Sequence, residues 1–302
     1  MRSDLDEVVL ASEHGLMIKE IIYGRLGLSR GLLRRMKNGG KVCLNGKPAF
    51  ITQRVKAGDR ISIYFADSAT KIVPQPMKLD IVYEDDSLLI INKAPHIAVH
   101  PTRTYPDGTL ANGVAYHWQK QGAARKVRLL HRLDRETSGL ILIAKEPYAY
   151  HRLVQQLRTR QLRRKYLAVV QGRPEAKVGT IDQPIGRDLN PEGHALKRTV
   201  TATGKSARTF YRVIKEYPLV SLLELELVTG RTHQIRVHLK WMGHPIVGDE
   251  MYGQASMLID RQALHAWSLE FTHPRSGQQL KVKAPIPPDI KAILSQQLQQ
   301  FQ

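Results

Sequence analysis

No uninterrupted apolar stretch in this 302-residue chain is longer than five residues, the length of Leu140–Ala144. Such a stretch cannot span a bilayer, because a membrane-spanning helix needs about 20 apolar residues. It is typical of a buried strand, and the chain length favours about two domains. With 42% hydrophobic and 24% charged residues, the composition is that of a globular protein, which excludes a disordered, collagenous or coiled-coil chain.

Short strands dominate the pattern, and helices are inserted between them. Apolar runs and turn residues predict strands at 41–44, 61–65, 81–83, 88–91, 139–144, 165–170, 210–215, 219–228 and 280–283. Periodicity, caps and prolines predict helices at 15–28, 30–38, 147–161, 232–242 and 288–298. Because the connections do not repeat as regular βαβ units, a mixed α+β fold is favoured over a doubly wound sheet.

Residues 67–78, with two prolines and little periodicity, are interpreted as a linker. We therefore predict a small N-terminal α/β domain at 1–66 and a large domain at 79–302. The small domain is expected to contain a helix pair and a small sheet, with a type I′ hairpin turn at Asn45–Gly46. The N-terminus lacks the pattern of a signal peptide, and Cys43 is the single cysteine, so we expect a cytoplasmic protein.

The net charge of +19 is concentrated in two blocks, residues 29–60 and 123–173, which together carry +18. This distribution indicates a polyanionic partner, either nucleic acid or an anionic membrane, and favours nucleic acid over a merely solvated basic surface. In the first block, four cations on or near the second predicted helix are expected to form one basic face: Arg30, Arg34, Arg35 and Lys37.

Several familiar catalytic motifs are excluded. Gly204-Lys205-Ser206 resembles the end of a phosphate-binding loop, but Thr199 stands where that loop needs its first glycine. His233 and His238 are five residues apart, not the four that place two zinc ligands on one helical face. The histidines and the cysteine show no metal-site spacing, so we expect no metal.

One unusual segment, His131–Leu140, places Asp134 between Arg132 and Arg135, directly before a predicted strand. An aspartate beside arginines is most often a surface ion-pair partner. The alternative is a nucleophilic or basic carboxylate that nearby cations keep ionised. The residues by themselves leave both interpretations open.

A second unusual segment, Leu227–Leu239, contains a strand end, a Thr-Gly turn and the start of a short helix. One hypothesis is a surface helix with a basic edge. The other places Arg236 on the inward face of the helix, where it can pair with a buried carboxylate.

Together these segments resemble the RluA-type family of RNA pseudouridine synthases. The matching stretches follow the family's order and cover about two thirds of the chain: 98–101, 131–139, 165–166, 229–239, 244–253 and 264–266. Residues 15–66 resemble the ribosomal protein S4-like RNA-binding domain. The resemblance implies a mixed, mostly antiparallel sheet of the pseudouridine synthase type in the large domain.

The resemblance also implies an isomerase that converts uridine in structured RNA to pseudouridine without a cofactor or metal. It makes Asp134 the essential carboxylate, which either attacks the sugar or removes a sugar proton. It makes Arg236 the partner of this carboxylate and Tyr166 the residue that packs on uracil; without the family, Tyr166 is an ordinary strand tyrosine. Further RNA contacts are expected at Arg132, Arg231, His131 and Lys165.

The partner implied is RNA, at 23S rRNA or tRNA uridine sites, and we expect a monomer that does not bind a membrane. Two rival hypotheses remain. A catalytically silent RNA-binding or ribosome-assembly factor on the same fold is disfavoured by the presence of Asp134, Tyr166 and Arg236. The other rival is a metal-dependent nuclease, whose activity EDTA would abolish, whereas an isomerase that needs no metal is insensitive to EDTA.

Overall fold

The computed structural model describes residues 4–29, 31, 41–65, 70–123, 125–189 and 197–299. The predicted basic face of the second helix lies outside these residues, so four predictions stay untested there: Arg30, Arg34, Arg35 and Lys37. Within the described ranges, no helix is long and apolar enough to cross a membrane.

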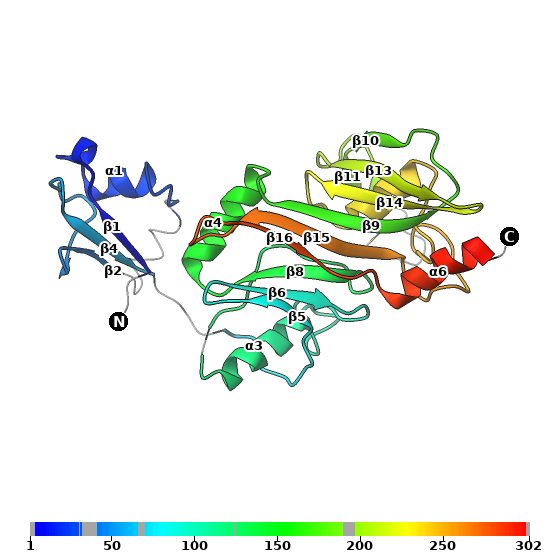
Figure 1. The fold of residues 1–302 in the computed structure, drawn as a ribbon, viewed down its shortest axis with the longest axis horizontal. Coiled ribbons are helices and arrows are strands. Elements are labelled where there is room, and N and C mark those ends of the chain that lie inside the picture. Colours follow the sequence, from blue (N-terminus) through cyan, green and yellow to red (C-terminus); the bar gives the residue numbers. More distant parts are fainter. Residues whose placement is uncertain are drawn as a thin grey trace.

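The large domain is built on one ten-stranded sheet (Figure 1). Its strands are β5 (Ile81–Glu84), β6 (Leu88–Lys93), β7 (Arg128–Leu129), β8 (Ser138–Ala144), β9 (Arg163–Gln171), β10 (Val178–Asp182), β13 (Arg208–Glu216), β14 (Val220–Leu227), β15 (Leu264–Thr272) and β16 (Gln279–Lys283). The order is β10-β13-β14-β9-β15-β8-β6-β5, with β16 on β15 and β7 on β8. Among the described strand pairs of this sheet, only β8 and β15 run parallel, so the predicted mixed, mostly antiparallel α+β fold is confirmed.

Apolar side chains cover both faces of this sheet, as strand β8 illustrates. Leu140 and Leu142 belong to the cluster that includes α4 (Pro147–Arg158). Ile141 and Ile143 belong to the cluster that includes α3 (Leu110–Lys120), α5 (Gln234–Trp241) and α6 (Pro288–Gln299). Every residue of β8 is buried. This explains why apolar residues follow one another in this strand and do not alternate with polar ones.

A separate two-stranded sheet projects from the large domain near α5. It pairs β11 (Ile185–Arg187) with β12 (Arg198–Val200), and α5 contacts β12. Neither strand was expected from the sequence pattern, because each is only three residues long.

The small domain contains a four-stranded sheet with the order β1-β4-β2-β3. Its elements are β1 (Leu5–Val8), the 3-10 turn Ala11–Glu13, α1 (Ile18–Tyr23), β2 (Lys41–Leu44), β3 (Lys47–Pro48) and β4 (Arg60–Tyr64). Asn45 and Gly46 have φ angles of 49° and 80°, the positive values that a type I′ turn requires. The helix predicted at 15–28 is shorter than expected, since it ends before Gly24.

The small domain contacts the large one through α4, which lies on its side of the molecule in Figure 1. The carbonyl oxygen of Gly27 accepts a hydrogen bond from Gln155 Nε2 at 2.6 Å and lies 2.9 Å from His151 Nε2. The rings of Phe65 and Tyr148 stack with centroids 6.4 Å apart. The two domains are therefore joined by side-chain contacts as well as by the chain between them.

Candidate active site

Asp134 lies on the loop between β7 and β8, and two buried cations hold the backbone of this loop. Lys93 Nζ donates hydrogen bonds to the carbonyl oxygens of Ala94 at 2.7 Å and Arg135 at 2.9 Å. Arg261 Nη1 donates to the carbonyl oxygen of Glu136 at 3.2 Å. Burial lowers the pKa of Lys93 to about 7. The two residues that follow Asp134 are thus fixed from inside the protein.

Gly139 allows this loop to enter the sheet. Its φ is +113°, and a Cβ atom at this position would lie 2.2 Å from the carbonyl oxygen of Ala266 on β15. No other residue can occupy such a position without moving the neighbouring backbone. The glycine therefore permits the parallel pairing of β8 with β15, directly behind Asp134.

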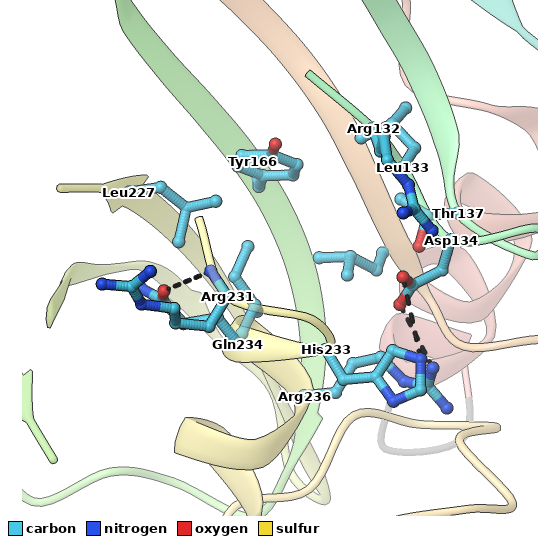
Figure 2. A pocket seen from close by; sticks show the side chains of 12 residues that line it. Arg132, Leu133, Asp134, Thr137, Tyr166, Leu227, Arg231, His233, Gln234 and Arg236 are labelled. Carbon is cyan, nitrogen blue, oxygen red and sulfur yellow. Dashed lines mark hydrogen bonds and ion pairs between the residues drawn. The ribbon is translucent and has the colours of Figure 1, made fainter. Parts of the chain in front are cut away.

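Arg236 links Asp134 to a second carboxylate, Asp249. Nε and Nη2 of Arg236 donate to the two carboxylate oxygens of Asp249 at 2.7 and 2.8 Å. Nη1 donates to Oδ2 of Asp134 at 3.1 Å, an interaction marked in Figure 2. The Asp249 side chain has no exposed surface, whereas that of Asp134 is 28% exposed. Arg236 is thus anchored by the buried carboxylate and presents its remaining nitrogen to the accessible one.

The charge of Arg236 is permanent in this setting. Burial lowers the pKa of Arg236, but the hydrogen bonds and charges of Asp249 and Asp134 outweigh burial and raise it. The guanidinium carbon also lies 4.9 Å from the centre of the Tyr252 ring, a cation–π contact. The predicted inward orientation of Arg236 and its contact with Asp134 are therefore present in the structure.

His233 and Tyr252 form the wall behind this pair. His233 has a left-handed backbone, with φ of 56°, at the start of α5. Its Nδ1 lies 2.9 Å from the Tyr252 hydroxyl, and its Nε2 lies 3.9 Å from Oδ1 of Asp134. Burial lowers the pKa of His233, and burial raises the pKa of Tyr252 to about 12. Both groups are therefore neutral near pH 7, and the positive charge beside Asp134 comes from Arg236.

Tyr166, on β9, lines the same pocket across from Asp134 and Arg236 (Figure 2). Only 4% of Tyr166 is exposed, and burial raises its pKa, so the phenol stays protonated. Apolar side chains complete the lining: Leu133, Leu227, Ile235 and Leu264. A carboxylate that is held by a buried guanidinium at the edge of an aromatic and apolar pocket is suited to attack, or to deprotonate, the sugar of a nucleoside whose base enters the pocket.

The predicted RNA-contacting residues differ in position. Arg132 and Arg231 are exposed and line the pocket, and Arg231 Nε donates to the carbonyl oxygen of Ser206 at 2.9 Å. Lys165 follows the alternation of β9 and points to the face opposite Tyr166. Its Nζ lies 3.7 Å from a carboxylate oxygen of Glu224, so the structure places Lys165 outside the pocket.

The structure corrects the prediction for His131. Its side chain is buried, and its Nε2 accepts a hydrogen bond from the backbone N–H of Leu142 at 3.2 Å. Burial lowers the pKa of His131 to about 3, so the imidazole is neutral. A neutral, buried side chain that packs beneath β8 supports the loop of Asp134 and has no access to RNA.

Sequence reasoning missed three site residues: His233, Asp249 and Tyr252. Two of them lie in the segment 244–253, which matches the family but in which no single residue was given a role. The signal available was the aspartate beside a glycine in a segment matching the family. Across the described residues, no group of three or more histidine, cysteine, aspartate or glutamate side chains is arranged to hold a metal ion.

The chain is similar to proteins of one known family. Residues 87–241 match the family described as RNA pseudouridylate synthase. An uncharacterized RNA pseudouridine synthase, YhcT, of Bacillus subtilis is 40% identical over 96% of both chains. The ribosomal large subunit pseudouridine synthase D of Neisseria meningitidis is 40% identical over 88% of this chain and 74% of its own. The structure of human RNA pseudouridylate synthase domain containing 1 superposes with a TM-score of 0.58, at 27% identity, over 75% of this chain and 96% of its own.

Proposed function

Since the chain belongs to the RNA pseudouridylate synthase family, and is therefore an isomerase acting on uridine in RNA, we propose that Asp134 is the carboxylate on which its reaction depends. The supporting observation is the pairing of Asp134 with Arg236, which is itself anchored by the buried Asp249. This arrangement places a positive charge beside the carboxylate and fixes its orientation, as a nucleophile or a base requires.

The reaction needs no oxidant or reductant. The bond between C1′ of the ribose and N1 of uracil breaks, the base turns, and a bond forms between C1′ and C5. The proton on C5 is released, and N1 regains a proton. Asp134 assists either by attacking C1′ or by removing a sugar proton. Tyr166 packs on the uracil ring and keeps the detached base in the pocket.

The proposed substrate is structured RNA of the large ribosomal subunit. Several proteins about 40% identical to this chain are named ribosomal large subunit pseudouridine synthase D, which supports this choice over tRNA. The target base has to leave its stack to reach Asp134, which costs a few kcal/mol and favours a weakly paired uridine. We further propose that the protein acts in the cytoplasm as a monomer.

Mapping pseudouridines tests this proposal. Ribosomal RNA and tRNA are compared between cells with and without the gene, and the deletion strain is complemented with wild type, Asp134→Asn or the surface variant Asp182→Asn. We expect at least one site in large-subunit rRNA to disappear and to return with wild type and Asp182→Asn, but not with Asp134→Asn. Restoration by Asp134→Asn contradicts the role of this carboxylate. Loss of tRNA sites alone contradicts the proposed substrate.

A further inference from the structure

A second cavity lies beside the active-site pocket and is larger, with a volume of about 460 Å³. Its walls are the β11–β12 hairpin, the turn at 203–205 and the turn at 230–232. Arg231 lines both cavities, so they are adjacent. Four of the ten residues that line the second cavity are cationic: Arg187, Arg198, Lys205 and Arg231.

This cavity concentrates positive charge on two facing strands. Arg187 and Arg198 are directly opposite each other in the register of β11 and β12, an arrangement that destabilises a strand pair unless an anion lies between the charges. In the part of the chain that the structure describes, no carboxylate forms an ion pair with any of the four cations. The protein thus tolerates a local repulsion that a bound anion would relieve.

A further cation lies behind the turn at Gly230. Arg164, on β9, is only 8% exposed, and its buried Nε has no hydrogen-bond partner among the described residues. An ideal Cβ atom on Gly230 would lie 3.5 Å from Nη1 of Arg164. The wall of the cavity is therefore backed by a largely desolvated charge, which strengthens the positive potential at its surface.

The turn at 203–205 is packed closely on the hairpin, which makes this a built site. The backbone N–H of Lys205 donates to the carbonyl oxygen of Ile185 at 2.9 Å, and the N–H of Ile185 donates back at 3.0 Å. A Cβ atom on Gly204 would lie 2.5 Å from the carbonyl carbon of Ile185. Gly204 and Lys205 belong to the segment that fails as a nucleotide-binding loop by sequence, yet the fold places Lys205 in an anion-attracting wall.

We propose that this cavity binds backbone phosphates of the RNA strand next to the target uridine. The inference rests on the proposed function, since that function supplies an RNA strand at the neighbouring pocket. A strand whose uridine enters the pocket of Asp134 passes Arg231, and its next phosphates meet Arg187, Arg198 and Lys205. Contacts of this kind position a strand without selecting its sequence.

The test uses the full-length double variant Arg187→Gln/Arg198→Gln and the control Lys78→Gln/Lys120→Gln, which lies outside both basic blocks. The control removes two exposed cations from the region of α3. Affinity for transcribed large-subunit rRNA is measured between 50 and 200 mM salt, together with KM and kcat for pseudouridine formation. Each lost phosphate contact flattens the plot of log affinity against log salt by about 0.7–0.9 units. We expect the cavity variant to flatten this plot by about one to two units and to raise KM more than it lowers kcat.

Equal slopes for wild type and the cavity variant overturn the proposal, and so does equal flattening by the control. The melting temperature of the cavity variant should be no lower than that of wild type, because the variant removes a repulsive pair. Should the double variant fold poorly, the single variant Lys205→Gln is measured in its place, with an expected flattening of about 0.7–0.9 units. The salt slope measures RNA binding alone, so it tests the role of the cavity whether or not pseudouridine forms. If no pseudouridine forms, only the proposed function is overturned.

Discussion

Replacing Asp249 with asparagine tests how Arg236 is held. Arg236 is 7% exposed, and the Asp249 side chain is fully buried, so the variant leaves a buried guanidinium that has lost its two-point partner. Removing one partner of a buried ion pair costs about 3–5 kcal/mol of unfolding free energy. In a protein of this size, we expect the melting temperature to fall by about 6–20 °C.

The matched control is Glu226→Gln, which removes a two-point carboxylate from an exposed arginine. Arg163 donates to both oxygens of Glu226, at 2.8 and 2.6 Å, but its side chain is 48% exposed. Such a surface pair contributes about 0–1 kcal/mol. Thermal and urea unfolding measure the loss of unfolding free energy in both variants. If Asp249→Asn costs no more than Glu226→Gln, the claim that a desolvated carboxylate anchors Arg236 is refuted.

A double variant separates the structural role of this pair from its effect on Asp134. Arg236→Leu/Asp249→Leu contains no unpaired buried charge, so it should recover part of the stability lost in Asp249→Asn. It should nevertheless form no pseudouridine, because Asp134 has lost its cation. Full activity in the folded double variant would contradict the proposed role of Arg236.

Three further predictions concern the support of the site and the small domain. Burial lowers the pKa of Lys93 to about 7, so the folded protein binds fewer protons than the unfolded chain between pH 7 and 10. The free energy of unfolding of wild type should therefore rise with pH relative to that of Lys93→Met, by up to about 1.4 kcal/mol per pH unit. Urea unfolding of both proteins across this pH range measures the difference. Gly139→Ala should abolish soluble folded protein, because its Cβ would collide with the backbone of Ala266; a normal melting curve would contradict the close approach. Deleting residues 1–70 should flatten the slope of log RNA affinity against log salt by about two to four units. Turnover at saturating RNA should stay near that of wild type. An unchanged slope would exclude the small domain as a phosphate-binding module for that RNA.

Local sequence patterns predicted the elements with clear apolar runs and turn signals. The strand predicted at 139–144 is β8, and the helix predicted at 147–161 begins at Pro147 as expected. Strand β15, in the middle of the sheet, was not predicted from periodicity, because His265, Ser268 and Glu270 interrupt its apolar pattern. Its place depends on pairing with β8 and β9, which are distant in sequence.

The site residues that were predicted lie in segments that match the family motifs. Asp134 and Arg236 are 102 residues apart, and their contact arises only when α5 packs beside the loop before β8. Asp249 was missed because an aspartate among turn formers looks like a turn residue. His131 was misplaced because no local pattern encodes its burial or the hydrogen bond that it accepts from the distant backbone N–H of Leu142.

Asp134 is proposed to perform chemistry and not merely to support RNA binding. The most direct test compares wild type and Asp134→Asn for release of tritium from RNA labelled at C5 of uridine, alongside RNA affinity for both proteins. We expect turnover to vanish in Asp134→Asn while affinity stays within about tenfold, or about 1.4 kcal/mol, of wild type. Tritium release by Asp134→Asn at a rate comparable to wild type would contradict the account.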